Sequence, residues 1–230
     1  ISVEDAIKNG FHREVIKETR IHKSLSHPNI VKIKESFEIE NADYDIFMVI
    51  IMEYCENGDL ADYLINNTIT DTSFKKEIMQ GVLSAVKYLH EKEISHGDIK
   101  LENILLDSNF SPKLCDFGYT HSERYAGDEA KCGTLYYSAP EKFFYGKQFD
   151  TLKSDIYALG ITFYAIDQLS FPYNAGDVII QIVGGKLCYN KEMDKQLLSL
   201  IQKCTELDPN QRPDIDDILN DEYLSNIEHS

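Results

Sequence analysis

The chain of 230 residues is long enough to bury a substantial core, in one large domain or in two tightly packed lobes. Apolar residues make up 43% of it and charged residues 27%, which excludes disordered and fibrous proteins. With 23 Lys and Arg against 39 Asp and Glu, the formal net charge of −16 would repel nucleic acid and anionic membrane surfaces, so we expect the protein to bind neither.

The five cysteines are an odd number, are widely separated and include no CxxC pair. They therefore indicate free thiols in a reducing compartment rather than a disulfide framework or a zinc site. Because the chain begins at Ile1 and no secretory leader opens it, we expect a segment of a longer cytoplasmic protein, with the nucleus as the alternative location.

The first part of the chain predicts one helix followed by two strands. Between Glu4 and Leu25 apolar residues recur at helical spacing, and the turn at Ser26 to Asn29 ends the helix because proline disfavours the α conformation of the residue before it. The segment from Ile30 to Ile39 partly alternates β-branched and charged residues, and Ile46 to Met52 is a β-rich apolar run. Two antiparallel strands joined by a loop at Glu40 to Asp43 fit this pattern best.

From Asn57 onward the pattern becomes helical. A helix is predicted at Asp59 to Leu64, and a long one begins with Thr72 as its N-cap. Further helical windows follow at Leu152 to Gln168, Asp177 to Val183, Met193 to Glu206 and Ile215 to Leu219. A small strand-bearing part (1–52) thus gives way, through a hinge-like junction (53–58), to a larger helical part (59–230). Clefts between such lobes are preferred ligand sites.

The segment from His96 to Asn103 carries the most chemical information. This loop could place the carboxylate of Asp98 near a nucleophilic hydroxyl and the amide oxygen of Asn103 near a metal ion. Asp116, in the triplet Asp-Phe-Gly, follows a short apolar stretch and could join Asn103 in binding a hard cation such as Mg²⁺. Lys100 could neutralise charge on a transferring phosphoryl group. These residue types suit phosphoryl transfer, in which the protein mainly positions groups and stabilises charge.

In these segments the sequence resembles the eukaryotic protein kinase family, and the resemblance covers essentially the whole chain. His96 to Asn103 resembles the catalytic loop, Asp116 to Gly118 the DFG element and Ser138 to Glu141 the APE element. Gly133 to Tyr137 is similar to the GTxxY segment, and Gln211 to Pro213 contains the late arginine that pairs with the APE glutamate. The resemblance implies an α+β, two-lobed protein-kinase-like fold with a truncated N-lobe and a mainly helical C-lobe.

The family pattern implies a role for each matching residue. Asp98 would be the catalytic base and Lys100 the lysine that stabilises the phosphate, with Thr134 as a further residue of the catalytic site. Asn103 and Asp116 would be the magnesium ligands. Because Lys100 and Thr134 resemble the serine/threonine kinases, the resemblance implies ATP and Mg²⁺ as cofactors and protein substrates with Ser or Thr acceptors.

The same resemblance implies an ATP site between the lobes. In it, Glu18 would be the helix-C glutamate and Met52 the gatekeeper, and Glu53 to Cys55 would be the hinge that contacts adenine. Asp59 would contact the ribose and Leu105 would form the apolar floor beneath the base, with Glu102 as a further residue of the site. For Asp59 the N-cap of the next helix is an equal alternative, and an N-cap is also the alternative to a role of Asp155 in bracing the catalytic loop. The segment from Glu18 to Val31 is similar to both calmodulin-dependent-type and polo-type kinases.

The chain departs from the family at three places. The Gly-rich loop and the strand lysine that pairs with Glu18 belong roughly twenty residues or more upstream of Glu18, yet only Gly10 precedes Gly58. We therefore expect residues 1–230 alone to bind nucleotide weakly and to have little activity, and a regulatory subunit or a flanking domain is a further expected partner. Gly97 replaces the arginine that commonly binds a phosphorylated activation loop, so we expect another form of control. His22 replaces an apolar residue that packs toward the DFG phenylalanine, and we expect it to be structural.

Two other functions remain as alternatives. A pseudokinase or interaction scaffold would keep the fold and lose catalysis, but the four polar residues of the proposed site are all present, namely Asp98, Lys100, Asn103 and Asp116. Small-molecule phosphotransferases of the aminoglycoside-kinase type share the His-Gly-Asp loop. The lysine at position 100 and the segment from Gly133 to Glu141 argue against that class.

Overall fold

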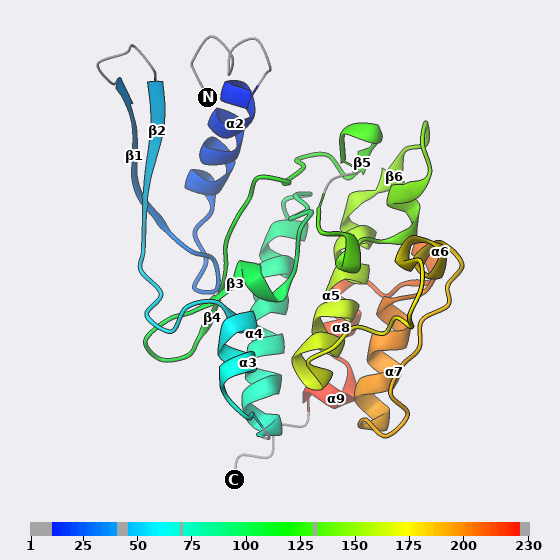
Figure 1. Cartoon of the computed structure of the whole chain (residues 1–230). Coiled ribbons are helices and arrows are strands. Elements are labelled where there is room, and N and C mark those ends of the chain that lie inside the picture. Colours follow the sequence, from blue (N-terminus) through cyan, green and yellow to red (C-terminus); the bar gives the residue numbers. More distant parts are fainter. Residues whose placement is uncertain (1–10, 41–45, 70, 131–132, 226–230) are drawn as a thin grey trace.

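The structure, a computed structural model, describes residues 11–40, 46–69, 71–130 and 133–225. The first part contains α2 (Phe11–Ser24) and an antiparallel hairpin of β1 (Ile33–Glu40) and β2 (Ile46–Met52). Figure 1 shows α2 standing beside this hairpin. The predicted helix and strands are thus confirmed in the described residues. The start of the predicted helix, in residues 1–10, and most of the loop predicted at Glu40 to Asp43 lie outside them.

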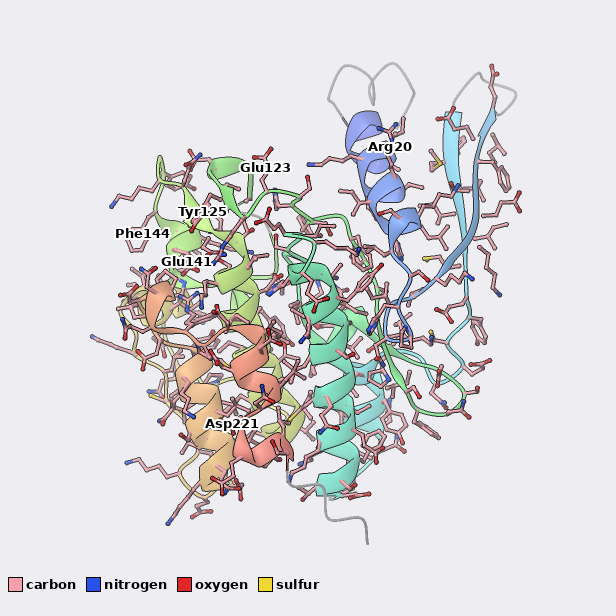
Figure 2. All side chains as sticks on the ribbon, turned by 180° about the vertical axis from the view of Figure 1, so that it is seen from behind. Arg20, Glu123, Tyr125, Glu141, Phe144 and Asp221 are labelled. Atoms are coloured by element: carbon pink, nitrogen blue, oxygen red, sulfur yellow. The ribbon has the colours of Figure 1, made fainter. Side chains whose placement is uncertain are left out.

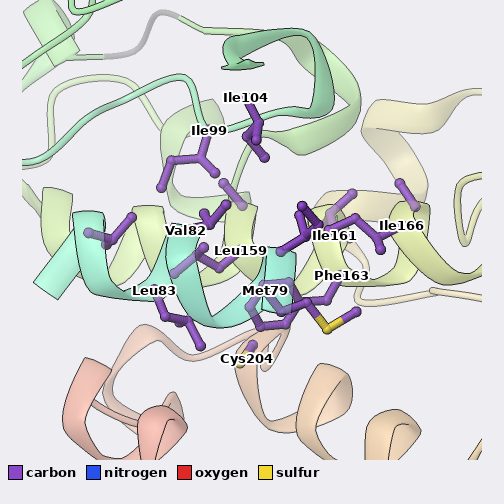
Figure 3. Close-up of a cluster of buried hydrophobic side chains, with 14 of the residues drawn as sticks. Met79, Val82, Leu83, Ile99, Ile104, Leu159, Ile161, Phe163, Ile166 and Cys204 are labelled. Atoms are coloured by element: carbon purple, nitrogen blue, oxygen red, sulfur yellow. The ribbon is translucent and has the colours of Figure 1, made fainter. Parts of the chain in front are cut away.

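The second part is built around two long helices, α4 (Thr72–His90) and α5 (Thr151–Gln168). Almost the whole of α5 is buried, as expected for a helix at the centre of a domain. α4 packs an apolar stripe that includes Met79, Val82 and Leu83 into the same core (Figure 3). No helix in the described part of the chain is long and apolar enough to cross a membrane.

The remaining elements surround these two helices (Figure 1). They are the helices α3 (Leu60–Asn66), α6 (Val178–Val183), α7 (Lys195–Cys204), α8 (Ile215–Leu219) and α9 (Glu222–Ser225), the antiparallel pairs β3 (Ile104–Leu106) with β4 (Pro112–Leu114) and β5 (Tyr125–Ala126) with β6 (Phe149–Asp150), and short 3₁₀ turns. The predicted helical windows are confirmed with small shifts at their ends. The predominance of helix in this part confirms the α+β, two-part expectation.

Aspartates close the N-termini of most of these helices. In α3, α4, α5, α6 and α7 the residue before the first turn is an aspartate whose carboxylate accepts a backbone N–H. The prediction of Thr72 as the cap of α4 is therefore wrong, because Asp71 accepts from the N–H of Ser73 at 2.8 Å. Five of the 39 acidic residues of the sequence thus cap the start of a helix.

A buried ion pair joins three segments of the helical part. Glu141, in a 3₁₀ turn at Pro140–Phe143, accepts two hydrogen bonds of 2.7 Å from the guanidinium of Arg212, as the family resemblance predicts. The hydroxyl of Ser154 in α5 also donates to Glu141, at 2.8 Å. In Figure 2, Glu141 lies at the same end of the helical part as Tyr125. The pair therefore connects the segment after β5 with α5 and with the region before α8.

We predict that Arg212→Ala lowers the free energy of unfolding by about 3–5 kcal/mol, because it leaves a partly buried carboxylate without its partner. The side chain of Arg212 is 0% exposed and that of Glu141 is 11% exposed. Urea unfolding measures the loss. Arg124→Ala is the control: it breaks a pair with Asp150 in which the arginine is 41% exposed, so it should cost about 1 kcal/mol or less. Equal losses in the two variants would contradict the prediction.

Candidate active site

The polar side chains predicted in the catalytic loop bond one another. Asp98 is 3% exposed, and its Oδ2 lies 2.8 Å from Nζ of Lys100. Its Oδ1 accepts from the backbone N–H of Thr134 at 2.7 Å, and Lys100 donates to Oγ1 of Thr134 at 2.7 Å. The side-chain amide of Asn103 donates to the carbonyl oxygen of Asp98 at 2.9 Å. The structure thus brings together all four residues that the sequence assigns to the catalytic set.

These contacts fix the charges of Asp98 and Lys100. Burial raises the pKa of Asp98, but the hydrogen bonds from Lys100 and Thr134 outweigh it and hold the pKa below the usual aspartate value. Burial lowers the pKa of Lys100, and its bond to Asp98 reverses this, so that the pKa lies above the ordinary lysine value. At neutral pH the pair is therefore an ionised carboxylate beside an ammonium group.

The loop is held from behind by Asp155, a residue inside α5. The carboxylate of Asp155 is almost fully buried and accepts from the backbone N–H of His96 at 2.8 Å and of Gly97 at 2.9 Å. Nε2 of His90 lies 3.1 Å from the same carboxylate. The role in bracing the loop is confirmed and the N-cap alternative for Asp155 is wrong, since Asp150 caps α5. The contribution of His90 has no signal in the sequence, because it depends on the packing of α4 against α5.

Gly97 lets the segment after the DFG element cross directly over the catalytic loop. Its φ of 83° favours glycine, and a Cβ at this position would lie 2.2 Å from the carbonyl oxygen of Tyr119. Nearby, Ser95 and His121 exchange two backbone hydrogen bonds of 2.9 and 3.2 Å. Nζ of Lys142, which sequence reasoning missed, donates to the carbonyl oxygen of Gly97 at 3.0 Å. Contacts through the main chain thus occupy the place where the family more often has an arginine.

The β3–β4 hairpin places Asn103 and Asp116 at the same end. The backbone N–H of Cys115 donates to the carbonyl oxygen of Asn103 at 2.9 Å, next to the pairing of Ile104 with Leu114. Because the Asn103 amide nitrogen bonds Asp98, its Oδ1 has no partner among the described residues. Asp116 is exposed, with one carboxylate oxygen accepting from the N–H of Gly118 at 3.2 Å.

These oxygens fit a magnesium ion. Mg²⁺ is usually bound by one or two protein oxygens together with substrate phosphates and water. The described residues contain no cluster of three or more His, Cys, Asp or Glu side chains that could hold a metal ion by themselves. Asn103 and Asp116 would supply part of a site that a phosphate-bearing substrate completes.

Three aromatic rings connect α2 to the site. Phe117 is fully buried, with its ring centroid 4.3 Å from that of His22 and 5.1 Å from that of His96. Nε2 of His22 donates to the carbonyl oxygen of Val31 at 2.6 Å. Burial is the main cause that lowers the pKa of His22, so the ring is neutral at physiological pH. The expectation that His22 is a packed structural residue is confirmed.

Glu18 brings a second carboxylate from α2 toward the DFG element. A Cβ on Gly118 would lie 3.2 Å from a carboxylate oxygen of Asp116 and 3.5 Å from one of Glu18. Burial, and then the negative charge of Asp116, raise the pKa of Glu18. Among the residues that the structure describes, Glu18 has no basic partner. Two carboxylates, those of Glu18 and Asp116, therefore approach each other between α2 and the DFG element.

The predicted hinge lies between β2 and α3. The side chain of Glu53 accepts from the N–H of Lys32 at 2.6 Å and pairs with Lys113 at 3.1 Å, so it ties the hinge to the residue before β1 and to β4. The carbonyl oxygen of Glu53 and the N–H of Cys55 bond no other residue in the described part of the chain. These two main-chain groups are suited to hydrogen bonds with the donor and the acceptor on the edge of adenine. Glu53 would then contact the base through its backbone carbonyl and not through its side chain.

The other predicted nucleotide residues lie around this junction. Met52 ends β2 and is 45% exposed. Asp59 caps α3 by accepting from the N–H of Asp62 at 2.9 Å, which confirms the N-cap alternative, and it pairs through its backbone with half-buried Leu105. Glu102 is exposed and lies beside Tyr137, whose pKa is raised by burial and by the charge of Glu102. Contacts of these residues with ribose or base stay predictions.

We predict that Gly97→Ala destabilises the chain more than Gly146→Ala. Gly146 has a similar φ of 71°, but a Cβ there meets nothing within 4 Å. Gly146→Ala should cost only the left-handed conformation, about 1–2 kcal/mol in free energy of unfolding. Gly97→Ala should cost more because the Tyr119 backbone must also move. Urea unfolding compares the variants, and an equal loss would show that the Tyr119 carbonyl imposes no constraint.

We predict that Glu18→Gln stabilises the chain at pH 7. An acid whose pKa is raised in the folded state is harder to ionise there than in the unfolded chain, so its charge costs stability above the raised pKa. As the pH falls through the raised pKa toward 4.5, the wild-type carboxyl gains its proton and the advantage of Gln should disappear. Urea unfolding at several pH values tests this, with exposed Glu192→Gln as control. A loss of stability in Glu18→Gln at pH 7 would contradict it.

Comparisons with known proteins agree with this geometry. Residues 2–224 match the family model of the protein kinase domain. The chain is 33% identical over 227 residues to a Zea mays protein named probable serine/threonine-protein kinase CCRP1, a match that covers 95% of the chain and 35% of that protein. It is 32% identical over 217 residues to the carbon catabolite-derepressing protein kinase of Secale cereale, which covers 92% of the chain and 42% of that protein.

The chain spans less than half the length of either of these two relatives. The match nevertheless includes almost every residue of the chain, from the helix before the hairpin to the last helices. It therefore contains both the catalytic loop and the buried ion pair between Glu141 and Arg212. The chain belongs to the protein kinase family.

Proposed function

We propose that the protein transfers the γ-phosphoryl group of MgATP to a serine or threonine hydroxyl of a protein substrate. The observation that carries this proposal is the closed set of bonds among Asp98, Lys100 and Thr134. It keeps a carboxylate ionised and an ammonium group charged in a loop that Asp155 braces. The names of the two relatives, both protein kinases, support the same reaction.

In this reaction Asp98 accepts the proton of the substrate hydroxyl. The hydroxyl oxygen forms a bond to the γ-phosphorus, the bond from that phosphorus to the bridging oxygen breaks, and ADP leaves. Lys100 lies beside both Asp98 and Thr134 and offsets negative charge on the transferred group. Asn103 and Asp116 would hold the magnesium ion, which neutralises phosphate charge when it is bound.

The site also bears on the two alternative functions. A scaffold without catalysis has no need for an ionised, buried Asp98 that is held by three other polar groups. A small-molecule phosphotransferase has no need for the platform that begins at Thr134, which contributes both its N–H and its hydroxyl to the site. The contacts of Thr134 therefore favour a protein substrate.

The proposal extends to the cellular location of the protein and to a partner that completes its nucleotide site. The four cysteines in the described residues are free thiols, which supports a reducing compartment, the cytoplasm or the nucleus. We expect residues 1–230 alone to bind nucleotide weakly, because no Gly-rich loop precedes Glu18 in this sequence, and Glu18 has no basic partner in the part of the chain that the structure describes. A flanking segment or a regulatory subunit would provide that cation.

The test measures transfer of ³²P from γ-labelled MgATP to a serine/threonine peptide library, with the complete gene product that carries residues 1–230. Asp98→Asn should lower kcat by about 10²–10⁴, the usual contribution of a general base. Thr134→Ala should also lose activity, whereas Thr134→Ser should keep most of it because the hydroxyl that accepts from Lys100 is retained.

Two outcomes would contradict the proposal. One is unchanged turnover in Asp98→Asn, which would show that this carboxylate takes no part in transfer. The other is a labelled product that carries phosphate only on tyrosine or only on a small molecule. Matching activity in Thr134→Ala and Thr134→Ser would contradict the role of the threonine hydroxyl.

A further inference from the structure

A cavity lies between α3, α4 and the turn that joins β3 to β4, apart from the residues of the active site. Its volume is about 430 Å³, and it opens to solvent between the ring of Tyr63 on α3, the side chains of Phe74 and Glu77 on α4, and Phe110 in the turn. We call it the α3–α4 cavity. None of the site residues discussed above lines it. Figure 1 shows α3, α4 and the β3–β4 pair next to one another.

The cavity exists because one face of α4 is shaped for it. Phe74, Glu77 and Gly81 are spaced three and four residues apart and therefore lie on the same face of the helix. A Cβ at Gly81 would lie 2.4 Å from Cγ of Pro112, so only glycine admits the turn this close. Glycine weakens a helix interior, and this close approach gives its presence here a structural reason.

The turn holds an aromatic ring at the edge of the cavity. Oδ1 of Asp107 accepts from the N–H of Asn109 at 2.9 Å and of Ser111 at 3.0 Å, and Phe110 between them has a φ of 61°. The Phe110 ring is 40% exposed. Its centroid lies 5.5 Å from that of Tyr63, which lies 5.9 Å from that of Phe74. Three rings therefore form one continuous wall.

Glu77 places a negative charge beside these rings. Its side chain is exposed, and among the described residues it forms no ion pair. Aromatic faces attract cations through their negative π surface, and a carboxylate next to them adds an ion pair. Rings and carboxylate together are complementary to a cationic group, and the acidic balance of the whole chain repels an anionic one.

We propose that the α3–α4 cavity binds an arginine side chain of a partner protein. A guanidinium is planar, stacks on aromatic rings and presents paired donors to a carboxylate. A lysine ammonium can also form an ion pair with the carboxylate, but as a point charge that does not stack on the rings in this way. The volume of the cavity exceeds that of one side chain, so residues that flank the arginine also fit. The proposal does not depend on catalysis and stands or falls separately from the proposed function.

The test uses N-acetyl-arginine methylamide as the probe and N-acetyl-citrulline methylamide as its neutral isostere. NMR of the chain, with ¹³C-labelled Phe and Tyr rings, follows the signals of Phe110 and Tyr63. We expect the arginine probe to bind at least five times more tightly than the citrulline probe. Raising NaCl from 50 to 500 mM should weaken only the arginine probe, because salt screens the ion pair.

Variants locate the contact. Glu77→Gln should reduce the preference for arginine to less than twofold, and Phe110→Leu should weaken the arginine probe at least threefold. Glu91→Gln changes an exposed glutamate that caps the opposite, C-terminal end of α4 and lies outside the cavity; it is the control and should change nothing. Both Glu77 and Phe110 are exposed enough for the variants to fold, and thermal unfolding checks this.

Three results would overturn the proposal. The first is equal binding of the arginine and citrulline probes, or no shift of either ring. The second is a preference for arginine that survives Glu77→Gln. The third is tighter binding of N-acetyl-lysine methylamide than of the arginine probe, because stacking on the rings would then contribute nothing.

Discussion

The carboxylate of Asp155 is the contact on which the site depends. It lies inside a helix that is buried on nearly all sides, and it accepts from two consecutive backbone N–H groups of the catalytic loop. A buried carboxylate without donors would be costly, so the loop and α5 hold each other in place. Asp98 follows directly after the bonded pair His96 and Gly97. Its side chain therefore reaches Lys100 and Thr134 from a main chain that these hydrogen bonds hold in place.

From that point two connections extend outward. Thr134 links the loop to the segment that ends in Glu141, and the Glu141–Arg212 pair fixes that segment to the region before α8. On the other side, the stack of His96, Phe117 and His22 reaches α2. The catalytic groups thus sit where both connections meet. A two-stranded hairpin is marginally stable by itself, so β1 and β2 depend on such contacts with the rest of the chain, which also include the pair of Glu53 with Lys113.

The sequence allowed the elements and the catalytic set to be predicted because both depend on local patterns. The stripe of α4 repeats at helical spacing, and the residues from His96 to Asn103 lie in one short loop. Contacts between segments that are distant in the sequence were harder to predict. His90 meets Asp155, and Glu53 meets Lys113, only after helices and strands have packed, and neither pair has a fixed spacing along the chain.

Where a prediction was wrong, two residues competed for the same role. Asp71 and Thr72 both favour an N-cap, and the helix starts one residue earlier than the simpler pattern indicates because the carboxylate reaches the N–H of Ser73. Asp150 and Asp155 present the same ambiguity in α5. Only the position of the helix relative to the core decides which of them ends the helix and which is buried.

The contact between Gly97 and the carbonyl oxygen of Tyr119 has an evolutionary consequence. Arginine at position 97 would not fit into this structure as a single change, since the backbone of the following segment already fills the space. The segment would first have to shift, and with it the pairing of Ser95 with His121. A catalytic loop with arginine at this position could therefore be grafted into this chain only together with the segment around Tyr119.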